Sequence, residues 1–322
     1  MNALLKEVIM DEKKRSGHIP VMLNESIDFM NLKAGDVVVD CTVGMGGHSE
    51  RILESILPGG KLIAIDKDSE SLKIAKEKLS RFKDSFYLFN DNFTNIKEIL
   101  HSLSIEKVDA VLFDLGISSY QLDSDRGFSF KRDAFLDMRM DANSKLTAYD
   151  IVNYYSEREI ARILKDFGEE RYHQRIAHGI VSARKEKAVE TTRELSGIIL
   201  EVVPYSYRKM RISPATRTFQ ALRIAVNREL ESIFKAVKDA IDVLLPEGRI
   251  VVISFHSLED RIVKRTFRDF QKEGHLQPLV SKPLIPSPLE VDINSRSRSA
   301  KLRAGKKCKN SDTNLFLKIF ML

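Results

Sequence analysis

The sequence is poor in cysteine and has no long hydrophobic run. Its 322 residues include only Cys41 and Cys308, which lie far apart and form no C-x-x-C pair. We therefore expect neither zinc nor redox chemistry and predict no bound metal. No apolar run approaches the roughly 18 residues that a membrane-spanning helix requires, so no membrane association is expected. Residues 1–15 lack the basic, apolar and small-residue regions of a secretory signal, and the expected location is therefore cytoplasmic.

Positive charge exceeds negative charge in this chain. There are 52 lysines and arginines against 46 aspartates and glutamates, which gives a net charge of +6 at pH 7. Since such an excess also occurs in proteins that bind no nucleic acid, its distribution is more informative than its size. Basic residues recur at positions 171–175, 208–211, 261–265 and 296–303. Together these stretches predict contact with the phosphate groups of a polyanionic partner.

The first third of the chain alternates strand and helix patterns. Short apolar runs occur at residues 37–40, 61–66, 86–89 and 110–114. Runs of this kind are typical of strands buried on both faces of a parallel sheet. Helical patterns follow the first two runs, at residues 48–57 and 69–82. This βαβα order predicts an α/β fold with a Rossmann-like sheet and helices on both of its faces.

The alternation stops after Asp114. Residues from about 131 to 213 show helix and loop patterns without a convincing strand, which predicts an inserted helical domain. The chain contains no internal repeat that would explain this change. We therefore expect two domains: an α/β domain of residues 1–130 and 214–322, and a helical domain of residues 131–213.

The α/β pattern resumes after the helical stretch. Apolar residues spaced by three and four between Thr218 and Leu244 predict one long helix with a buried face. Residues 249–254 form the next strand pattern, and the sequence SLED at 257–260 predicts a capping box at the start of another helix. The stretch 275–300, rich in proline and serine, is expected to be extended or loop, and Ala300 opens a short pattern that predicts a closing edge strand.

A glycine-rich turn follows the first predicted strand. Gly44, Gly46 and Gly47 lie where a parallel sheet binds its ligands, and glycine there permits positive φ and close approach to a ligand. Asp66 ends the next strand, 19 residues after Gly47, at a spacing suited to hydrogen bonds with ribose hydroxyls. Asp40 precedes the turn, where an acid can meet the amino group of a methionine moiety but would repel a pyrophosphate. The pattern favours S-adenosylmethionine over a nicotinamide cofactor.

Several longer motifs resemble one family. The sequence is similar to the MraW-type family of ribosomal RNA small subunit methyltransferases H, and the resemblance runs in order from about His18 to Arg303. The motifs are HIPVMLNE (18–25), GMGGH (44–48), DLGISSYQLD (114–123), RGFSF (126–130), LDMRM (136–140), FQALRI (219–224) and ISFHSLEDR (253–261). Residues 310–322 extend past the usual end of the family, and we assign them no role.

The resemblance implies both a reaction and a set of site residues. The implied reaction is methylation of N4 of a cytosine, position 1402, in the decoding centre of 16S rRNA in the small ribosomal subunit. The implied fold is a class I methyltransferase sheet with a helical insert that helps to form the RNA site. The implied contacts to S-adenosylmethionine are Gly46, Gly47, His48, Asp66, Phe93, Asp114 and Gln121.

Asp114 is the leading candidate for the chemistry, because it ends the fourth predicted strand at the mouth of the site. Methyl transfer is an in-line displacement, so the protein must mainly align donor and acceptor and exclude water. A hydrogen-bond acceptor facing the amine N–H would raise its electron density. The family's D-L-G-I-S-S differs from the D-P-P-Y of many amino-methyltransferases, so Asp114 has a second possible role, that of holding the cofactor, which we favour.

If Asp114 holds the cofactor, other polar residues are expected to contact the cytosine, and these are Asp137, Asn227, His256 and Ser257. Two roles are equally open for His256: a general base at a strand end, or a polar residue that flanks a helix. His48 is either a cofactor contact or a helix cap. The run from Asp137 to Asp141 is either a pocket wall, which we favour, or a structural ion pair. A flipped or unpaired base requires a stacking partner, for which the candidates are Phe93, Tyr120, Phe128 and Phe255.

Three other functions fit part of the sequence. A nicotinamide-dependent oxidoreductase shares the glycine turn, but its motif is G-x-G-x-x-G rather than G-x-G-G. A non-catalytic RNA-binding protein would explain the basic stretches, although it would not require both Asp66 and Asp114. An enzyme with the same chemistry acting on DNA or transfer RNA is disfavoured because no DNA-reading motif is present.

Overall fold

The computed structural model describes residues 19–309, and these fall into two compact units. The first unit contains residues up to Gly116 together with those from Leu230 onward, and the second is Ile117–Glu229. Residues 1–15, where no secretory signal is expected, and the extension at 310–322 lie outside the described residues. Between residues 19 and 309, no helix is both long and apolar enough to cross a membrane.

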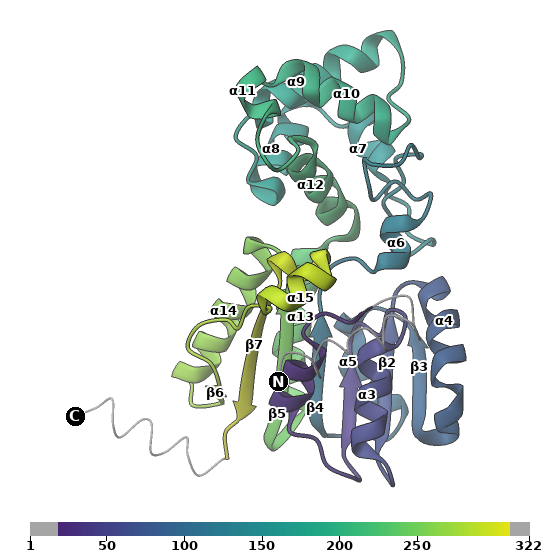
Figure 1. Ribbon diagram of the computed structural model, residues 1–322, viewed down its shortest axis with the longest axis vertical. Helices are drawn as coiled ribbons and strands as arrows, with labels where there is room; N and C mark the ends of the chain where they lie inside the picture. Colours follow the sequence, from purple (N-terminus) through teal and green to yellow (C-terminus); the bar gives the residue numbers. More distant parts are fainter. Residues whose placement is uncertain (1–18, 310–322) are drawn as a thin grey trace, which may run out of the picture. The chain divides into compact units, whose positions relative to one another are not determined.

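The first unit contains a seven-stranded sheet in the order β3-β2-β1-β4-β5-β7-β6 (Figure 1). The strands are β1 (Val37–Asp40), β2 (Lys61–Asp66), β3 (Phe86–Asn90), β4 (Val108–Asp114), β5 (Leu244–Ser254), β6 (Leu276–Pro278) and β7 (Lys301–Lys307). Strands β1 to β5 pair in parallel, whereas β7 is antiparallel to β5 and β6. Asp40 at the end of β1 is in register with Ala64 of β2 and Leu112 of β4. The carboxyl ends of these three strands therefore lie together, and the predicted α/β sheet is confirmed.

Successive residues of the central strands enter two apolar cores, one on each face of the sheet. Val39 and Ile63 pack with residues of the helices Ile96–Ser102, Glu229–Val243 and Ser257–Lys272. Their neighbours Val38 and Leu62 pack with residues of the helices Leu23–Met30, Gly47–Ile56 and Ser69–Leu79. Because the side-chain period of a strand is two, an unbroken apolar run supplies both cores at once.

The helices of this unit surround the sheet (Figure 1). They are α2 (Leu23–Met30), α3 (Gly47–Ile56), α4 (Ser69–Leu79), α5 (Ile96–Ser102), α13 (Glu229–Val243), α14 (Ser257–Lys272) and α15 (Pro288–Ile293), with short 3-10 turns η1 (Ser80–Ser85), η2 (Phe93–Asn95) and η3 (Ser295–Ser299). Asp68 caps α4 by accepting a hydrogen bond from the Glu70 amide at 3.2 Å, which satisfies one of the free N–H groups at the helix start.

The second unit is helical. Its helices are α6 (Ser119–Asp123), α7 (Ala148–Tyr154), α8 (Glu157–Gly168), α9 (His173–Glu186), α10 (Thr192–Val202), α11 (Tyr205–Arg208) and α12 (Ala215–Asn227). Capping boxes open α7, α8 and α10, at Thr147, Ser156 and Thr191. Within residues 117–229 the strand pairing is limited to one isolated bridge, Phe135 to Thr191. The unit has its own apolar core, so it packs as a separate body.

The helical unit is longer at both ends than the expected 131–213. Phe128 on the N-terminal side and Phe219 and Leu222 on the C-terminal side are buried in the helical core. Phe130 packs edge-on against Phe219, with ring centroids 5.4 Å apart. The unit runs from Ile117 to Glu229, and its apolar core extends past both ends of the stretch in which the strand pattern is lost.

Two sequence expectations about elements are wrong. The predicted long helix is two helices, α12 and α13, because Arg228 between them adopts the left-handed conformation with φ of 49°. Its periodic apolar pattern continues across this break, which is why the sequence did not reveal it. In addition, β7 is not an edge strand, since the three-residue strand β6 pairs with its outer side. A strand this short, ending in Pro278, leaves little pattern to detect.

Candidate functional site

The glycine turn connects β1 to α3 through two residues with positive φ. Gly44 has φ of 50° and Gly46 has φ of 82°, and α3 begins immediately afterwards at Gly47. The Gly46 amide donates to the Val43 carbonyl at 2.7 Å, which closes the turn. This is the left-handed geometry that favours glycine, and it places the start of a helix at the carboxyl end of the sheet.

Gly47 is needed for a different reason, namely close packing. A Cβ atom at this position would lie 2.3 Å from Cγ of Pro20, a distance that no real contact reaches. The segment 19–22 therefore lies directly on the first turn of α3. It is held in place from α15, because the Met22 amide donates to Glu290 Oε1 at 2.8 Å and Asn294 Nδ2 donates to the Ile19 carbonyl at 3.0 Å.

Sequence reasoning gave no role to these anchoring residues. The motif that contains Pro20 was noted only for its resemblance, and Glu290 lies in a stretch expected to be loop. Ser287 caps α15 by accepting from the Glu290 amide, and proline occupies the first helical position, which is a recognisable helix start. That signal could have located the helix, but not its partner 268 residues earlier in the sequence.

Asp40 has a structural role at the end of β1, and its expected contact with a methionine amino group stays a prediction. Its side chain is fully buried. One carboxylate oxygen accepts from the Thr42 amide at 3.1 Å and the other accepts from Ser49 Oγ at 2.7 Å. Burial raises the pKa of Asp40 to about 6, although both hydrogen bonds favour its ionised form. Asp40 thus ties the end of β1 to the turn and to α3.

Asp66 is linked directly to the glycine turn. Its Oδ2 accepts from the Gly44 amide at 2.8 Å, and its Oδ1 accepts from the Asp68 amide at 2.9 Å. Burial raises the pKa of this carboxyl, and the two backbone hydrogen bonds partly oppose that shift. The two features that the sequence paired by spacing are therefore joined by a hydrogen bond.

Asp114 and His48 face each other at the end of β4. His48 Nδ1 lies 3.6 Å from Asp114 Oδ2, and the other ring nitrogen, Nε2, lies 3.1 Å from the Val21 carbonyl oxygen. The Asp114 amide donates to Thr42 Oγ1 at 2.6 Å, while its Oδ1 is buried without a hydrogen-bond partner. Burial, followed by repulsion from Asp40, Glu259 and Glu290, raises the pKa of Asp114 well above its usual value. An oxygen in this state is suited to accept a hydrogen bond from a ligand.

Phe93 follows β3 at the same end of the sheet. Its ring packs edge-on against Phe113, with centroids 5.7 Å apart, and is almost entirely buried. Lys67 Nζ lies 5.4 Å from the ring centroid, within the range of a cation–π contact. The other aromatic candidates differ: Phe128 belongs to the helical core, Tyr120 is exposed, and the Phe255 ring lies against Gly116.

His256 is the N-cap of α14, so the structure supports its helix-flanking reading. Glu259, three residues later, accepts from the Phe255 amide at 2.7 Å and the His256 amide at 3.3 Å. The capping box is therefore His256 with Glu259, one residue earlier than the predicted pair of Ser257 and Asp260. His256 Nε2 also lies 3.1 Å from Glu259 Oε1, and Glu259 is fully buried.

Gln121 belongs to the helical unit. Its Oε1 accepts from the Ser118 amide at 3.0 Å, and its own amide donates to Ser118 Oγ at 3.2 Å. This capping box opens α6 and buries the Gln121 side chain. The other six residues that the resemblance assigns to the cofactor are all in the first unit.

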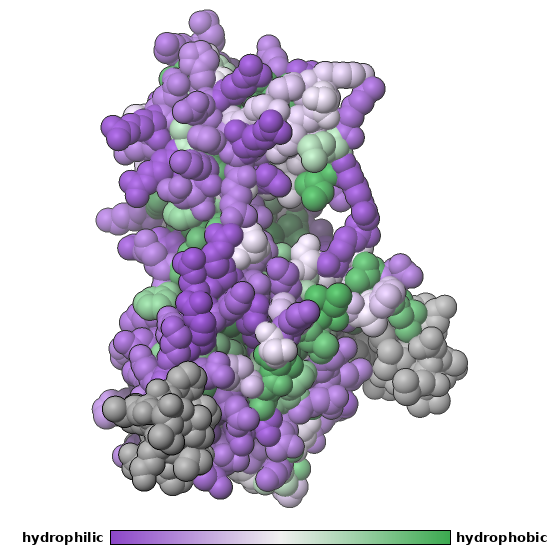
Figure 2. All heavy atoms as spheres, turned by 90° about the vertical axis from the view of Figure 1, so that its left-hand side faces the viewer, coloured by the Kyte–Doolittle hydropathy of each residue, from purple (hydrophilic) through white to green (hydrophobic). Residues whose placement is uncertain are grey.

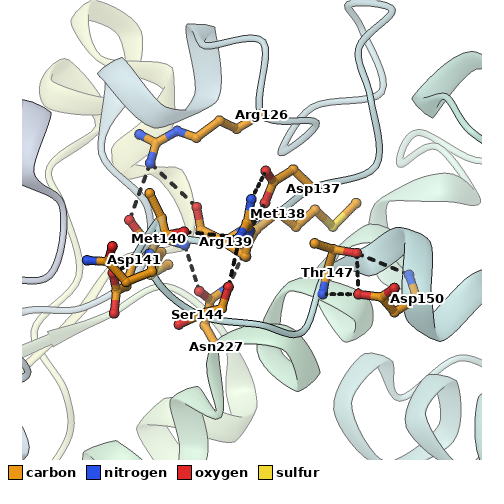
Figure 3. A network of polar contacts seen from close by, with 12 residues as sticks. Arg126, Asp137, Met138, Arg139, Met140, Asp141, Ser144, Thr147, Asp150 and Asn227 are labelled. Carbon is orange, nitrogen blue, oxygen red and sulfur yellow. Dashed lines mark hydrogen bonds and ion pairs between the residues drawn. The ribbon is translucent and has the colours of Figure 1, made fainter.

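The run from Asp137 to Asp141 forms a polar network that contains the expected structural ion pair (Figure 3), and its role as a pocket wall stays a prediction. Arg139 donates to both carboxylate oxygens of Asp137, at 2.7 and 2.8 Å. Asn227 accepts from the Met140 amide and donates to the Met138 carbonyl, both at 2.8 Å. The polar groups of Asp137 and Asn227 are thus engaged inside the helical unit, which argues against both as base contacts.

One predicted phosphate contact is also buried. Arg303 lies in β7 and its Nε donates to Asp260 Oδ1 at 2.7 Å, with only 8% of the residue exposed. Arg298 on η3 is exposed. The basic stretch at 296–303 therefore divides into a surface part and a part that is paired within the sheet.

The family comparison agrees with this geometry. Residues 15–308 match the model of the MraW methylase family. The chain belongs to the MraW methylase family. It is 50% identical over 290 residues to the ribosomal RNA small subunit methyltransferase H of Persephonella marina, and 49% identical over 290 residues to that of Sulfurihydrogenibium sp.; each alignment covers 90% of this chain and 99% of the relative. Among solved structures, the fibrillarin of Aeropyrum pernix with bound S-adenosyl-L-methionine is 10% identical, with a TM-score of 0.38, over 92% of this chain and 73% of that one.

Membership of the MraW methylase family settles the class of enzyme and its methyl donor. The chain is an S-adenosylmethionine-dependent methyltransferase with a Rossmann-like sheet. The preference for S-adenosylmethionine over a nicotinamide cofactor is confirmed, although Asp40, which suggested it, is occupied within the protein.

Replacing Gly47 with alanine tests the packing of segment 19–22 on α3. The new Cβ would overlap the Pro20 ring, so we expect the segment to be displaced. The expected costs are about 1–3 kcal/mol of the free energy of unfolding, as for overpacked cores, and at least tenfold weaker binding of S-adenosylhomocysteine by calorimetry.

Gly197→Ala is the matched control, because a Cβ at this exposed position in α10 meets nothing within 4 Å. It should leave ligand affinity unchanged and raise helix stability slightly. Unaltered binding in Gly47→Ala would show that segment 19–22 has no influence on the site.

Asp137→Asn tests whether the network in Figure 3 is structural. Arg139 would lose its charged partner, and we expect the free energy of unfolding by urea to fall by about 1–2 kcal/mol. Burial alone would raise the pKa of Asp137, but pairing with Arg139 outweighs it and lowers the pKa below 3.8. The difference between wild type and variant should therefore be complete above pH 3.8 and shrink as the pH falls below it.

Asp133→Asn serves as the comparison, since Asp133 forms an exposed pair with Arg193 at 3.5 Å. It should change stability by less than about 0.5 kcal/mol. Equal effects of the two substitutions would contradict a special role for the Asp137 network.

Proposed function

We propose that this chain transfers the methyl group of S-adenosylmethionine to the exocyclic N4 of a cytosine in 16S rRNA of the small ribosomal subunit. The relatives named ribosomal RNA small subunit methyltransferase H are matched over 99% of their length, which supports an rRNA substrate. The sequence resemblance supplies the position, cytosine 1402 in the decoding centre. The structural observation that supports an amine acceptor best is Asp114, whose Oδ1 is buried at a strand end without a hydrogen-bond partner.

The residues of the first unit fit S-adenosylmethionine. The turn through Gly46 and Gly47 brings backbone close to a ligand, and Asp66 at the end of β2 is suited to accept hydrogen bonds from ribose hydroxyls. Phe93 lies after β3, where an adenine ring would meet an apolar surface. His48 and Asp114 complete the proposed contacts in this unit, and Gln121 stays a prediction from the resemblance.

In the proposed mechanism, Asp114 acts on the acceptor amine. The sequence favours a role in holding the cofactor, but the buried Oδ1 without a hydrogen-bond partner supports contact with an amine N–H as well. S-adenosylmethionine supplies a methyl group carried by a positively charged sulfur. The amine of cytosine is a weak nucleophile because its lone pair is delocalised into the ring, and a carboxylate that accepts its N–H raises its electron density. Orientation and exclusion of water supply most of the remaining rate enhancement. His256 caps α14 and contacts Glu259, so the mechanism gives it no part in the transfer, and its role as a general base stays a prediction from the sequence.

Transfer of labelled methyl groups followed by nucleoside analysis tests this function. We expect N4-methylcytidine in 16S rRNA, either as naked RNA or within small subunits, and no label in transfer RNA or DNA. Asp114→Asn should lower the single-turnover rate by more than about 100-fold, the usual contribution of a positioned acid or base. Label in another nucleoside, or only in transfer RNA or DNA, would refute the proposed substrate.

An RNA substrate would require a surface on the protein that binds phosphate groups. Charged and polar side chains cover most of the face of the helical unit seen in Figure 2. Exposed basic residues of this unit include Arg171, Arg175, Lys209 and Arg211, and Lys209 Nζ lies 4.5 Å from the Tyr205 ring centroid. Exposed cations beside an exposed aromatic ring suit single-stranded RNA, which offers both phosphates and unstacked bases.

The salt dependence of RNA binding tests the basic stretch on η3. Replacing both Arg296 and Arg298 with alanine should reduce the slope of log K against log salt concentration by roughly 1–2, since each lost phosphate contact removes about 0.7–0.9. Arg51→Ala, on the exposed side of α3 and paired with Glu54, is the control and should leave the slope unchanged. An unaltered slope in the double variant would remove η3 from the RNA interface.

A further inference from the structure

The contact of His48 with the Val21 carbonyl determines that its Nε2 carries hydrogen. A carbonyl oxygen can only accept a hydrogen bond, so the contact of 3.1 Å between His48 Nε2 and the Val21 carbonyl requires hydrogen on Nε2. The neutral ring then carries a lone pair on Nδ1, and this atom faces Asp114 Oδ2 at 3.6 Å. The ring is buried, with 6% exposed.

The Val21 carbonyl is held by contacts on both sides. Pro20 lies against Gly47 at the start of α3. The adjacent Met22 amide donates to Glu290, and Asn294 donates to the Ile19 carbonyl. The residues on both sides of Val21 are thus fixed, to α3 and to α15 with its C-cap, which gives the carbonyl a defined direction toward His48. Metal-binding and catalytic histidines commonly have their tautomer set by a backbone carbonyl in this way.

The carboxyl of Asp114 is surrounded by negative charge. Burial removes the carboxyl from water, and Asp40 of β1, Glu259 of α14 and Glu290 of α15 repel its ionised form as well. His48 of α3 is the basic side chain paired with it among the described residues. The protonated form of Asp114 is therefore favoured more than that of an ordinary aspartate, and a protonated carboxyl needs an acceptor for its hydrogen.

We propose that His48 is a positioning residue for Asp114, and that its neutral imidazole accepts at Nδ1 the hydrogen of the Asp114 carboxylic acid formed during the reaction. The inference rests on the proposed function, because it needs an amine as acceptor. It gives His48 a role beyond cofactor contact, because His48 stabilises the protonated carboxyl of Asp114.

The proton balance of the step defines this role. The acceptor nitrogen gains a bond to the methyl carbon, and the electron pair of the old C–S bond stays on sulfur. The nitrogen then loses one proton, which passes to the carboxylate of Asp114. His48 takes no net charge in this scheme, because it only accepts a hydrogen bond from the new carboxylic acid. Asp114 returns to its ionised form when the proton leaves to solvent after turnover.

The pH dependence of His48→Gln tests the proposal. Glutamine can still donate from its amide to the Val21 carbonyl, but it offers no lone pair corresponding to Nδ1. Transfer requires ionised Asp114, so the rate rises with pH through the Asp114 pKa. Loss of the acceptor destabilises the protonated form, and the midpoint of the rise in the single-turnover rate should move about one pH unit lower. The plateau rate should fall about 3- to 10-fold, because Asp114 becomes a weaker base.

The opposite sign would overturn the proposal. If His48 were a cation paired with the Asp114 carboxylate, its removal would move the midpoint to higher pH. An unchanged midpoint would mean that the two side chains are not coupled. His101→Gln, an exposed histidine on α5, is the control and should shift neither the midpoint nor the plateau. All rates are measured at saturating S-adenosylmethionine, so that a change in cofactor affinity does not enter.

A second measurement uses wild-type protein and does not depend on methyl transfer. In protein labelled with nitrogen-15 at its seven histidines, nuclear magnetic resonance separates protonated from unprotonated ring nitrogens. We expect the His48 ring to show hydrogen on Nε2 and a bare Nδ1 at neutral pH. Two protonated nitrogens would refute the proposal. If wild-type enzyme yields no methylated cytosine at all, the proposed function fails; if it does but the midpoint and ring state disagree, only the role of His48 fails.

Discussion

The contact between Pro20 and Gly47 is the constraint on which the rest of the site depends. Because residue 47 has no side chain, an N-terminal segment can lie directly on the first turn of α3. That position aims the Val21 carbonyl at His48, and His48 in turn faces Asp114. The turn glycines with positive φ shape the backbone, but it is this close packing that connects the turn to the chemistry.

Carboxylates at the strand ends are held in two different ways. Asp40 accepts hydrogen bonds from the Thr42 amide and Ser49 Oγ, and Asp66 accepts from the amides of Gly44 and Asp68. Because the fold already holds the backbone amides in place, Asp40 and Asp66 fix the geometry of the turn between β1 and α3. Asp114 differs, since one of its oxygens is buried without a hydrogen-bond partner and its neighbours include further acids. Asp114 thus keeps one buried oxygen without a hydrogen-bond partner, whereas both oxygens of Asp40 and of Asp66 already accept at least one, and such an oxygen is expected in a group that meets a ligand.

Sequence patterns predicted what local rules determine and missed what depends on tertiary packing. The apolar runs located the central strands, and the spacing from Gly47 to Asp66 identified two features that share a hydrogen bond through Gly44. The same patterns could not show that Arg228 divides a continuous apolar stripe into two helices, because a single left-handed residue leaves the periodicity intact. Nor could they show that Arg303 is paired within the sheet, since a basic residue in a strand looks the same whether its partner is a phosphate or an aspartate.

The anchoring of segment 19–22 by α15 also sets the order in which the enzyme becomes complete during synthesis. Glu290 and Asn294 are separated from their partners by 268 and 275 positions. Domains generally fold as units while the chain emerges from the ribosome, yet this site lacks two of its supports until residue 294 has been made. The helical unit has its core between residues 128 and 226. This part of the chain is synthesised, and can fold, much earlier. A nascent chain therefore acquires a folded helical unit before it can acquire a finished methyl-transfer site.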